Sequence, residues 1–97
     1  MKQRRERLEI VKDILEVVKR KYPIKPTRLM SVSNLSPQMF YEYIKELTNK
    51  DFVKIVFDEK LKREFLITDK GRRFLKECSI IENFLDKYEI KEFVIRK

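Results

Sequence analysis

The chain has 97 residues, of which 42% are hydrophobic and 41% are charged. Its net charge is +8 and its pI is near 9.7. This charge favours an anionic binding partner over a basic surface that is only solvated. This length suits one domain with a single modest core. With no histidine and only Cys78 as a cysteine, the chain lacks the usual general base and the residues of a structural zinc site. We therefore expect no enzyme, no metal and no cofactor.

The first element is an amphipathic helix from about residue 4 to 22. Its apolar residues recur at steps of three and four, and they are Leu8, Val11, Ile14, Leu15 and Val18. Basic residues close the helix and Pro23 stops it. Thr27 is then a candidate N-cap for a short second helix, with apolar residues Leu29, Met30 and Val32.

A third helix is expected to begin abruptly at Ser36-Pro37 and to run to residue 49 or 50. The Ser36 hydroxyl can accept a hydrogen bond from a first-turn amide, and Pro37 suits the first helical position, which needs no amide proton. One stripe of the helix is apolar and predicts a buried face, made of Phe40, Tyr43, Ile44 and Leu47. The other faces carry the residues free to meet a partner, which are Gln38, Met39, Tyr41, Glu42 and Lys45.

A β-hairpin is expected next, with strands at 52–57 and 64–68 that are rich in β-branched and aromatic residues. No Asn-Gly or Asp-Gly turn fixes its register. Asp58 and Glu59 at the charged tip are paired carboxylates, but an exposed turn offers no desolvation to shift a pKa, so we interpret them as surface residues that aid solubility.

The last helix begins after Thr68, a candidate N-cap. Apolar residues repeat at heptad positions, with an interruption at Glu92, and these are Phe74, Cys78, Ile81, Leu85, Tyr88 and Ile95. An unbroken helix over 69–97 would be about 43 Å long, too long to bury its distal stripe on its own domain. We therefore expect a winged-helix domain at 1–76 and a coiled-coil dimerisation helix at 77–97, with a seam of Ile81, Leu85, Tyr88 and Ile95. The alternative is a helix that ends near Tyr88, followed by a strand or folded-back tail.

The element order α-α-α-β-β-α within one small, mainly α domain is that of a winged helix-turn-helix, with the hairpin as the wing. The stretches "TRLMSVSNLSPQMFYEYIKEL" and "LITDKGRRFL" resemble the small archaeal winged-helix proteins of the 10a type. The resemblance covers about residues 8–76. It implies a homodimer that binds duplex DNA in transcription or chromatin organisation. Pro37, where that family often carries an aromatic residue, and the long acidic wing are departures that affect which DNA sequence is read.

For DNA binding we expect base contacts from the third helix and phosphate contacts from basic residues elsewhere. Gln38 can make a bidentate contact to adenine, and Lys45 can reach guanine or phosphate. Residues 34–50 carry two lysines and two glutamates, so this helix is neutral. We therefore expect its contacts to bases to contribute less to the affinity than the phosphate contacts do. Ser36, Met39, Tyr41 and Glu42 complete the expected surface, and phosphate anchors are expected at Lys2, Arg4, Arg5, Arg28, Lys60 and Lys62.

A second interpretation stays open, in which a degenerate winged helix uses its neutral third helix to bind another protein within a transcription or repair assembly. No apolar window is long enough for a membrane span, and the basic start "MKQRRERLEI" lacks the apolar core of a signal peptide. We expect a cytoplasmic, nucleoid-associated protein without a small-molecule substrate.

Overall fold

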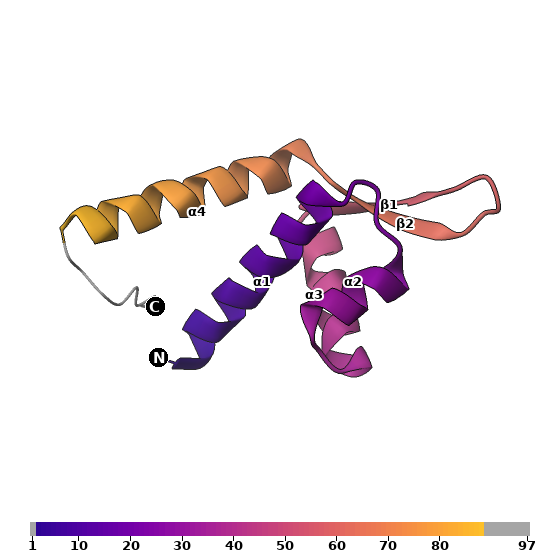
Figure 1. The fold of residues 1–97 in the computed structure, drawn as a ribbon, viewed down its shortest axis with the longest axis horizontal. Coiled ribbons are helices and arrows are strands. Elements are labelled where there is room, and N and C mark those ends of the chain that lie inside the picture. The colour runs from indigo at the N-terminus through magenta and orange to yellow at the C-terminus, as the bar shows by residue number, and fades with distance from the viewer. Residues whose placement is uncertain (1, 89–97) are drawn as a thin grey trace.

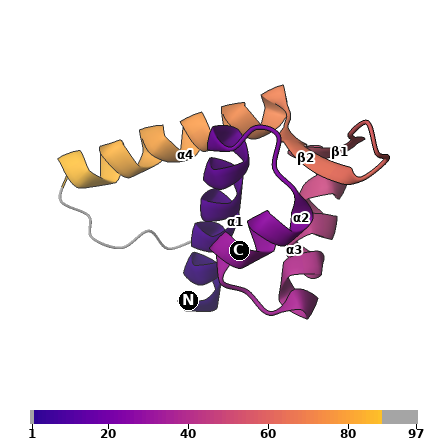
Figure 2. The same cartoon turned by 45° about the vertical axis from the view of Figure 1, so that its right-hand side comes forward.

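A computed structural model describes the backbone of residues 2–88 and the side chains of residues 7–88. Four helices and one hairpin follow in the expected order (Figures 1 and 2): α1 Lys2–Arg20, α2 Pro26–Ser33, α3 Pro37–Asn49, β1 Val53–Phe57, β2 Arg63–Ile67 and α4 Asp69–Lys87. The α1, α2 and α3 helices gather below the hairpin, and α4 extends away from them on the opposite side from the wing. This architecture is a winged helix-turn-helix.

A single core joins the helices to the base of the hairpin. The core is formed by the inner side of α1, the apolar stripe of α3 and the inward-facing residues of both strands. Its fully buried large side chains are Phe40, Phe65, Ile14, Leu15, Leu29, Leu47, Val18 and Val53. The sequence prediction that Phe40, Tyr43, Ile44 and Leu47 are core residues is confirmed, since each is at most 6% exposed. Their burial fixes α3 against the rest of the domain.

The two strands are antiparallel, with Val53 opposite Ile67 and Phe57 opposite Arg63. Ile24 forms an isolated antiparallel bridge to the hairpin. Its N–H donates to the carbonyl oxygen of Phe65 at 3.2 Å, and its carbonyl oxygen accepts from the N–H of Phe65 at 2.8 Å. Residues directly opposite each other share a face, so this register places Val53, Phe65 and Ile67 together in the core.

Two expected helix boundaries differ from the observed ones. Thr27 is not the N-cap of α2, since the helix already begins at Pro26 and Lys25 occupies the N-cap position. Proline favours this earlier start because its backbone is preorganised for the first helical position. The α1 helix ends at Arg20 rather than 22. By contrast, α3 begins as predicted, and the Ser36 hydroxyl accepts a hydrogen bond from the N–H of Met39 at 3.3 Å.

The α4 helix starts as expected, with the Thr68 hydroxyl accepting from the N–H of Gly71 at 2.9 Å. Gly71 sits in close contact with the hairpin, because a Cβ there would lie 2.3 Å from the carbonyl oxygen of Phe52. The helix runs to Lys87 with Tyr88 as its C-cap, so the expected unbroken helix to residue 97 is not confirmed and the described backbone agrees with the alternative end near Tyr88. Its distal turns leave Ile80, Ile81 and Phe84 exposed and gain little packing, which is what stabilises helices in proteins. Ile95 and the rest of 89–97 lie outside the described residues.

Candidate nucleic-acid interface

The helix-turn-helix is formed by α2, α3 and a three-residue turn between them. Asn34 takes the left-handed conformation (φ 59°) that ends α2, and asparagine tolerates it better than most residues. Ser36 then caps α3. The turn therefore has the local chemistry that starts α3 at a fixed residue, with its first turn exposed.

The outer face of α3 carries the five residues that the sequence predicted to be presented, and all five are exposed: Gln38, Met39, Tyr41, Glu42 and Lys45. Gln38 lies in the first turn, and Lys45 lies two turns further along the helix. Ser36 and Arg28 are exposed beside this face. The structure thus brings these residues onto the helix-turn-helix, and whether they touch DNA stays a prediction.

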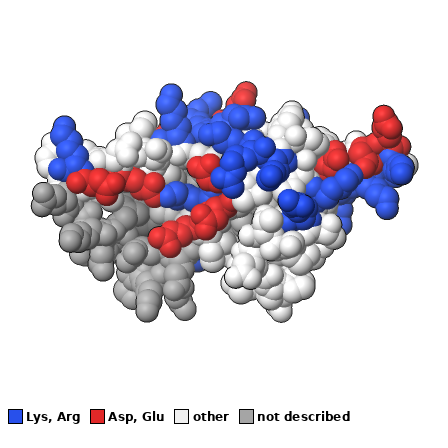
Figure 3. Space-filling model, in the orientation of Figure 1, with Lys and Arg blue, Asp and Glu red and all other residues white. Residues whose placement is uncertain are grey.

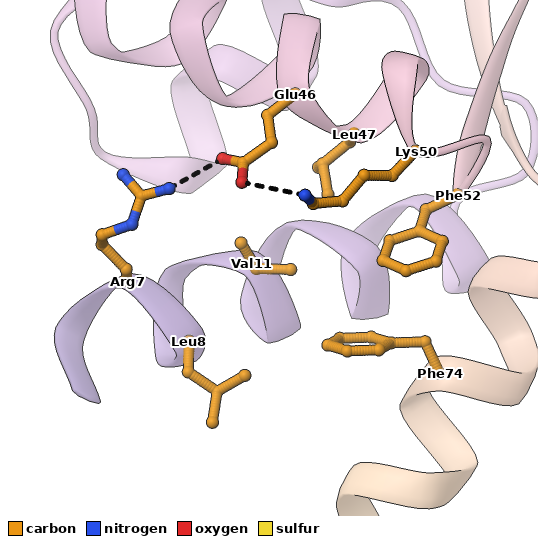
Figure 4. Close-up of a pocket in the computed structure, with 8 residues that line it drawn as sticks. All are labelled: Arg7, Leu8, Val11, Glu46, Leu47, Lys50, Phe52 and Phe74. Carbon is orange, nitrogen blue, oxygen red and sulfur yellow. Dashed lines mark hydrogen bonds and ion pairs between the residues drawn. The ribbon is translucent and has the colours of Figure 1, made fainter. Parts of the chain in front are cut away.

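The inner end of α3 is fixed to α1 through charged and apolar contacts around one pocket (Figure 4). Glu46 accepts from Arg7 at 2.9 Å and pairs with Lys50 at 3.6 Å, and the Arg7 guanidinium lies over the ring of Tyr43. The pocket has a volume of 300 Å³, and Leu8, Val11, Leu47, Phe52 and Phe74 line its apolar part. Phe52 and Phe74 stack at 4.8 Å between ring centres. These contacts set the orientation of α3 relative to α1 and α4.

The wing tip is organised by Asp58, which corrects the interpretation of this residue as an ordinary surface carboxylate. One oxygen, Oδ1, accepts from the backbone N–H groups of Lys60 and Lys62 at 2.8 and 2.9 Å. The other pairs with the ammonium of Lys25, which also pairs with Glu64 at 3.1 Å. The Lys25 hydrogen bond first, and the two backbone donors with it, lower the pKa of Asp58 to about 2. In turn, Asp58 and Glu64 raise the pKa of Lys25.

Basic side chains form a band that sequence patterns do not predict as a unit. Figure 3 shows blue side chains along the upper part of the molecule and toward the wing, while the lower right, over α2 and α3, is largely white. Two neighbouring hollows join parts of the band: Lys19, Arg72 and Lys76 line one together with Glu16, and Arg20, Lys21, Lys25 and Arg28 line the other. We call these seven basic residues the basic band.

The sequence contains a signal for five of the seven residues of this band. Residues 17–41 contain five basic residues and no acidic one. The remaining two, Arg72 and Lys76, join them because α4 packs against α1. Of the expected phosphate anchors, Lys60 and Lys62 are exposed at the wing, and the side chains of Lys2, Arg4 and Arg5 lie outside those described.

The distal part of α4 exposes apolar side chains. Of the expected dimerisation residues, Ile81 and Tyr88 are exposed and Leu85 is half-buried. Ile80 and Phe84 are exposed as well, at 57% and 56%, and they were missed because strict heptad spacing skips them. Cys78 is half-buried, and burial raises the pKa of its thiol, which is consistent with a small apolar role.

Within residues 2–88 none of the helices combines the length and apolar character needed to cross a membrane. Over the same described part of the chain, His, Cys, Asp and Glu side chains do not gather in groups of three or more that could hold a metal ion.

Comparison with known proteins bears on the fold. A family model described as winged helix-turn-helix matches residues 4–86, and no curated protein matches the chain. Similar solved structures include MepR, a transcription regulator of the Staphylococcus aureus multidrug efflux pump MepA, at 9% identity, with a TM-score of 0.73 over 95% of this chain and 72% of that one. A mutant of Lactococcus lactis ZitR in apo form has 19% identity and a TM-score of 0.65, over 90% of this chain and 68% of that one. At these identities the likeness concerns the fold.

Proposed function

The chain belongs to the winged helix-turn-helix family, and from this premise we propose that it binds duplex DNA as a homodimer and regulates transcription or organises chromatin. The resemblance to the archaeal 10a type supports the homodimer and a nucleoid-associated place in the cytoplasm. The observation that carries the proposal is the division of α3 into a buried face and a fully presented one.

The presented face of α3 has the size and chemistry for the major groove. The groove is about 12 Å wide and admits one α-helix. Gln38 stands in the first turn, where side chains reach base edges, and its amide can donate to and accept from adenine. Lys45, further along, can reach guanine or phosphate. Met39, Tyr41 and Glu42 complete the contact surface.

Phosphate contacts supply most of the affinity in this proposal. Arg28 on α2 and Lys60 and Lys62 on the wing are all exposed. Lys2, Arg4 and Arg5, whose side chains lie outside those described, are further phosphate anchors in this proposal. Each phosphate that a basic side chain neutralises releases counterions, so binding should weaken steeply with salt.

The test is fluorescence anisotropy with a random-sequence duplex at several salt concentrations. We expect log Kd to rise with log salt with a slope of about 0.9 for each phosphate contacted. The double variant Arg28→Ala/Lys45→Ala should bind about tenfold more weakly with a slope smaller by about 2. The control Lys70→Ala/Arg73→Ala removes the same charge from exposed positions of α4 outside the basic band and should change binding less. Affinity unaffected by Arg28→Ala/Lys45→Ala would contradict the placement of the surface.

The homodimer is proposed to form through the distal part of α4. Ile80, Ile81, Phe84 and Tyr88 are exposed there on a helix that extends beyond its domain. A second copy would bury these side chains, and burial of apolar area drives such association. Leu85→Asp should yield monomers by sedimentation while the far-UV spectrum stays helical. Asn83→Asp, which adds the same charge two residues away on the exposed side, should remain dimeric.

A protein-binding module is the second candidate, and one observation favours it. The surface over α2 and α3 is neutral and carries exposed apolar side chains, among them Val32 at 47%, Met39 at 43% and Tyr41 at 47%. Such a surface can bind a protein without phosphate contacts. Absent DNA binding even at low salt, together with a monomeric mass, would support this candidate over the first.

A further inference from the structure

We propose that the wing inserts Leu61 as an apolar wedge into the minor groove of duplex DNA, where it partly unstacks a base step. The inference rests on the proposed function, because it names how the wing meets the same duplex. Leu61 is the single apolar residue inside the charged tip "DEKLK".

The folding of the domain does not account for Leu61. Its side chain is 81% exposed, more than any other described large hydrophobic side chain. It lies between Lys60 and Lys62 at the end of a hairpin that projects beyond α2 and α3 (Figures 1 and 2). A leucine placed there gains almost nothing from burial.

The backbone conformation makes leucine an unfavourable choice as well. Leu61 has φ 61°, in the left-handed region where its Cβ crowds the following carbonyl group. Glycine or asparagine is the usual residue in this conformation. An apolar, branched side chain at a strained and exposed position points to a use outside the folded domain.

The turn holds Leu61 in place instead of leaving it free. The N–H of Leu61 donates to the carbonyl oxygen of Asp58 at 3.0 Å, and the N–H of Asp58 donates to the carbonyl oxygen of Lys62 at 2.9 Å. The Asp58 carboxylate clamps the residues on both sides of Leu61 through their N–H groups, and Lys25 ties that carboxylate to the start of α2. A wedge needs this rigidity, because a mobile side chain would lose its conformational entropy on insertion.

The charges around Leu61 select DNA over an apolar partner. Lys60 and Lys62 flank it, and Arg63 is exposed on the adjoining strand. The charge of Asp58 is paired with Lys25, which leaves Glu59 as the acidic side chain of the tip without a described ion pair. Behind the tip, Phe57 is 61% exposed and lies opposite Arg63. An apolar apex among cations complements a narrow groove between two phosphate backbones.

The chemistry of DNA makes such a wedge effective at certain steps. Pyrimidine–purine steps such as TA unstack readily, and proteins that bind the minor groove insert leucine and similar side chains into base steps, kinking the duplex. The wedge therefore adds a preference for deformable steps that needs no hydrogen bond from the wing to a base.

The test uses a duplex that carries 2-aminopurine in TA steps, because the fluorescence of this base rises when it unstacks. Wild-type protein should raise the fluorescence on binding. Leu61→Ala should abolish most of the rise and weaken binding about fivefold to twentyfold. Leu61→Lys should also abolish the rise while it keeps or tightens binding, because it replaces the wedge with a charge.

Leu61→Gly controls for the fold, because glycine relieves the left-handed strain and removes the side chain. Its melting temperature should equal or exceed that of the wild type, and its fluorescence rise should be lost. If wild type binds in a salt-dependent manner and all three variants give the same fluorescence as wild type, the wedge is overturned and the proposed function stands. If wild type shows no salt-dependent binding to duplex, the proposed function itself fails, and the wedge with it.

Discussion

The α3 helix and the wing tip are both exposed on the same domain, but they differ in the side chains they expose and in the contacts that hold them. The exposed face of α3 is neutral and mostly polar, and four buried side chains on its other face fix it to the core. The wing tip has no core beneath it, and hydrogen bonds and one ion-pair cluster around Asp58 hold an apolar residue between two lysines.

This difference suggests that α3 and the wing would make different kinds of contact with one duplex. A side chain on a rigid helix can be placed for hydrogen bonds to base edges, which is how sequence is read directly. A charged hairpin with an apolar tip suits phosphate contact and deformation of the groove, which depend on DNA shape.

The largest effect is expected where α3 meets the core. Phe40→Ala removes a side chain that is fully buried and should lower the free energy of unfolding by about 3–5 kcal/mol. The neighbouring Tyr41→Ala acts on a side chain that is 47% exposed and should change it by about 0.5 kcal/mol or less. Urea unfolding of both variants measures this. Similar losses for both would contradict the assignment of the two faces.

A smaller effect, confined to specificity, is expected for base reading by α3. Gln38→Ala should cost about 1–3 kcal/mol of discrimination at one base pair of a selected site and leave the salt slope unchanged. Binding to that site and to its single-base variants measures the change. A uniform loss across all sequences would mean that Gln38 contacts the backbone.

In contrast to Gln38, the wing lysines should affect the salt dependence of binding and not its sequence preference. Lys60→Ala/Lys62→Ala should weaken binding to every sequence by a similar factor, about tenfold, and reduce the salt slope by about 2. Glu59→Gln, which removes an acid from the same tip, should tighten binding slightly. A change in sequence preference with an unchanged slope would assign base reading to the wing.

The smallest effect concerns the clamp at Asp58 and depends on pH. Folding lowers the pKa of this carboxyl from 3.8 to about 2, so the folded state binds its proton less readily than the unfolded state. The stabilisation is therefore fully present above about pH 5 and is lost as the pH falls through 4 toward 2. The difference in urea midpoint between wild type and Asp58→Asn should be constant above pH 5 and shrink below it. A constant difference down to pH 2 would contradict the clamp.

The parts of the fold that depend on neighbouring residues were predictable from sequence. Ser36-Pro37 fixed the start of α3, and the apolar spacing of α3 identified its buried face, because capping and helical periodicity act over a few residues. Thr27 misled for a related reason, since it resembles a cap while Pro26 already occupies the first helical position.

The parts that depend on distant contacts were not predictable. The role of Asp58 requires Lys25, which is 33 residues away in the chain, and the basic band requires the packing of α4 on α1. The heptad pattern favoured a helix longer than the described one, which ends at Lys87, because periodicity does not show whether anything packs against the distal turns, where Ile80 and Phe84 are exposed. For the candidate interface, exposure of the α3 residues followed from periodicity, but the clamped wing tip did not.

The most direct test of the central claim is photocrosslinking from α3 to DNA. A benzophenone side chain at position 41, which is exposed on α3, should crosslink to a bound duplex, and the same group at position 83, exposed on distal α4, should not. Crosslinking from position 41 that disappears at high salt is the result we predict. A bound duplex that crosslinks from position 83 and not from position 41 would contradict the account.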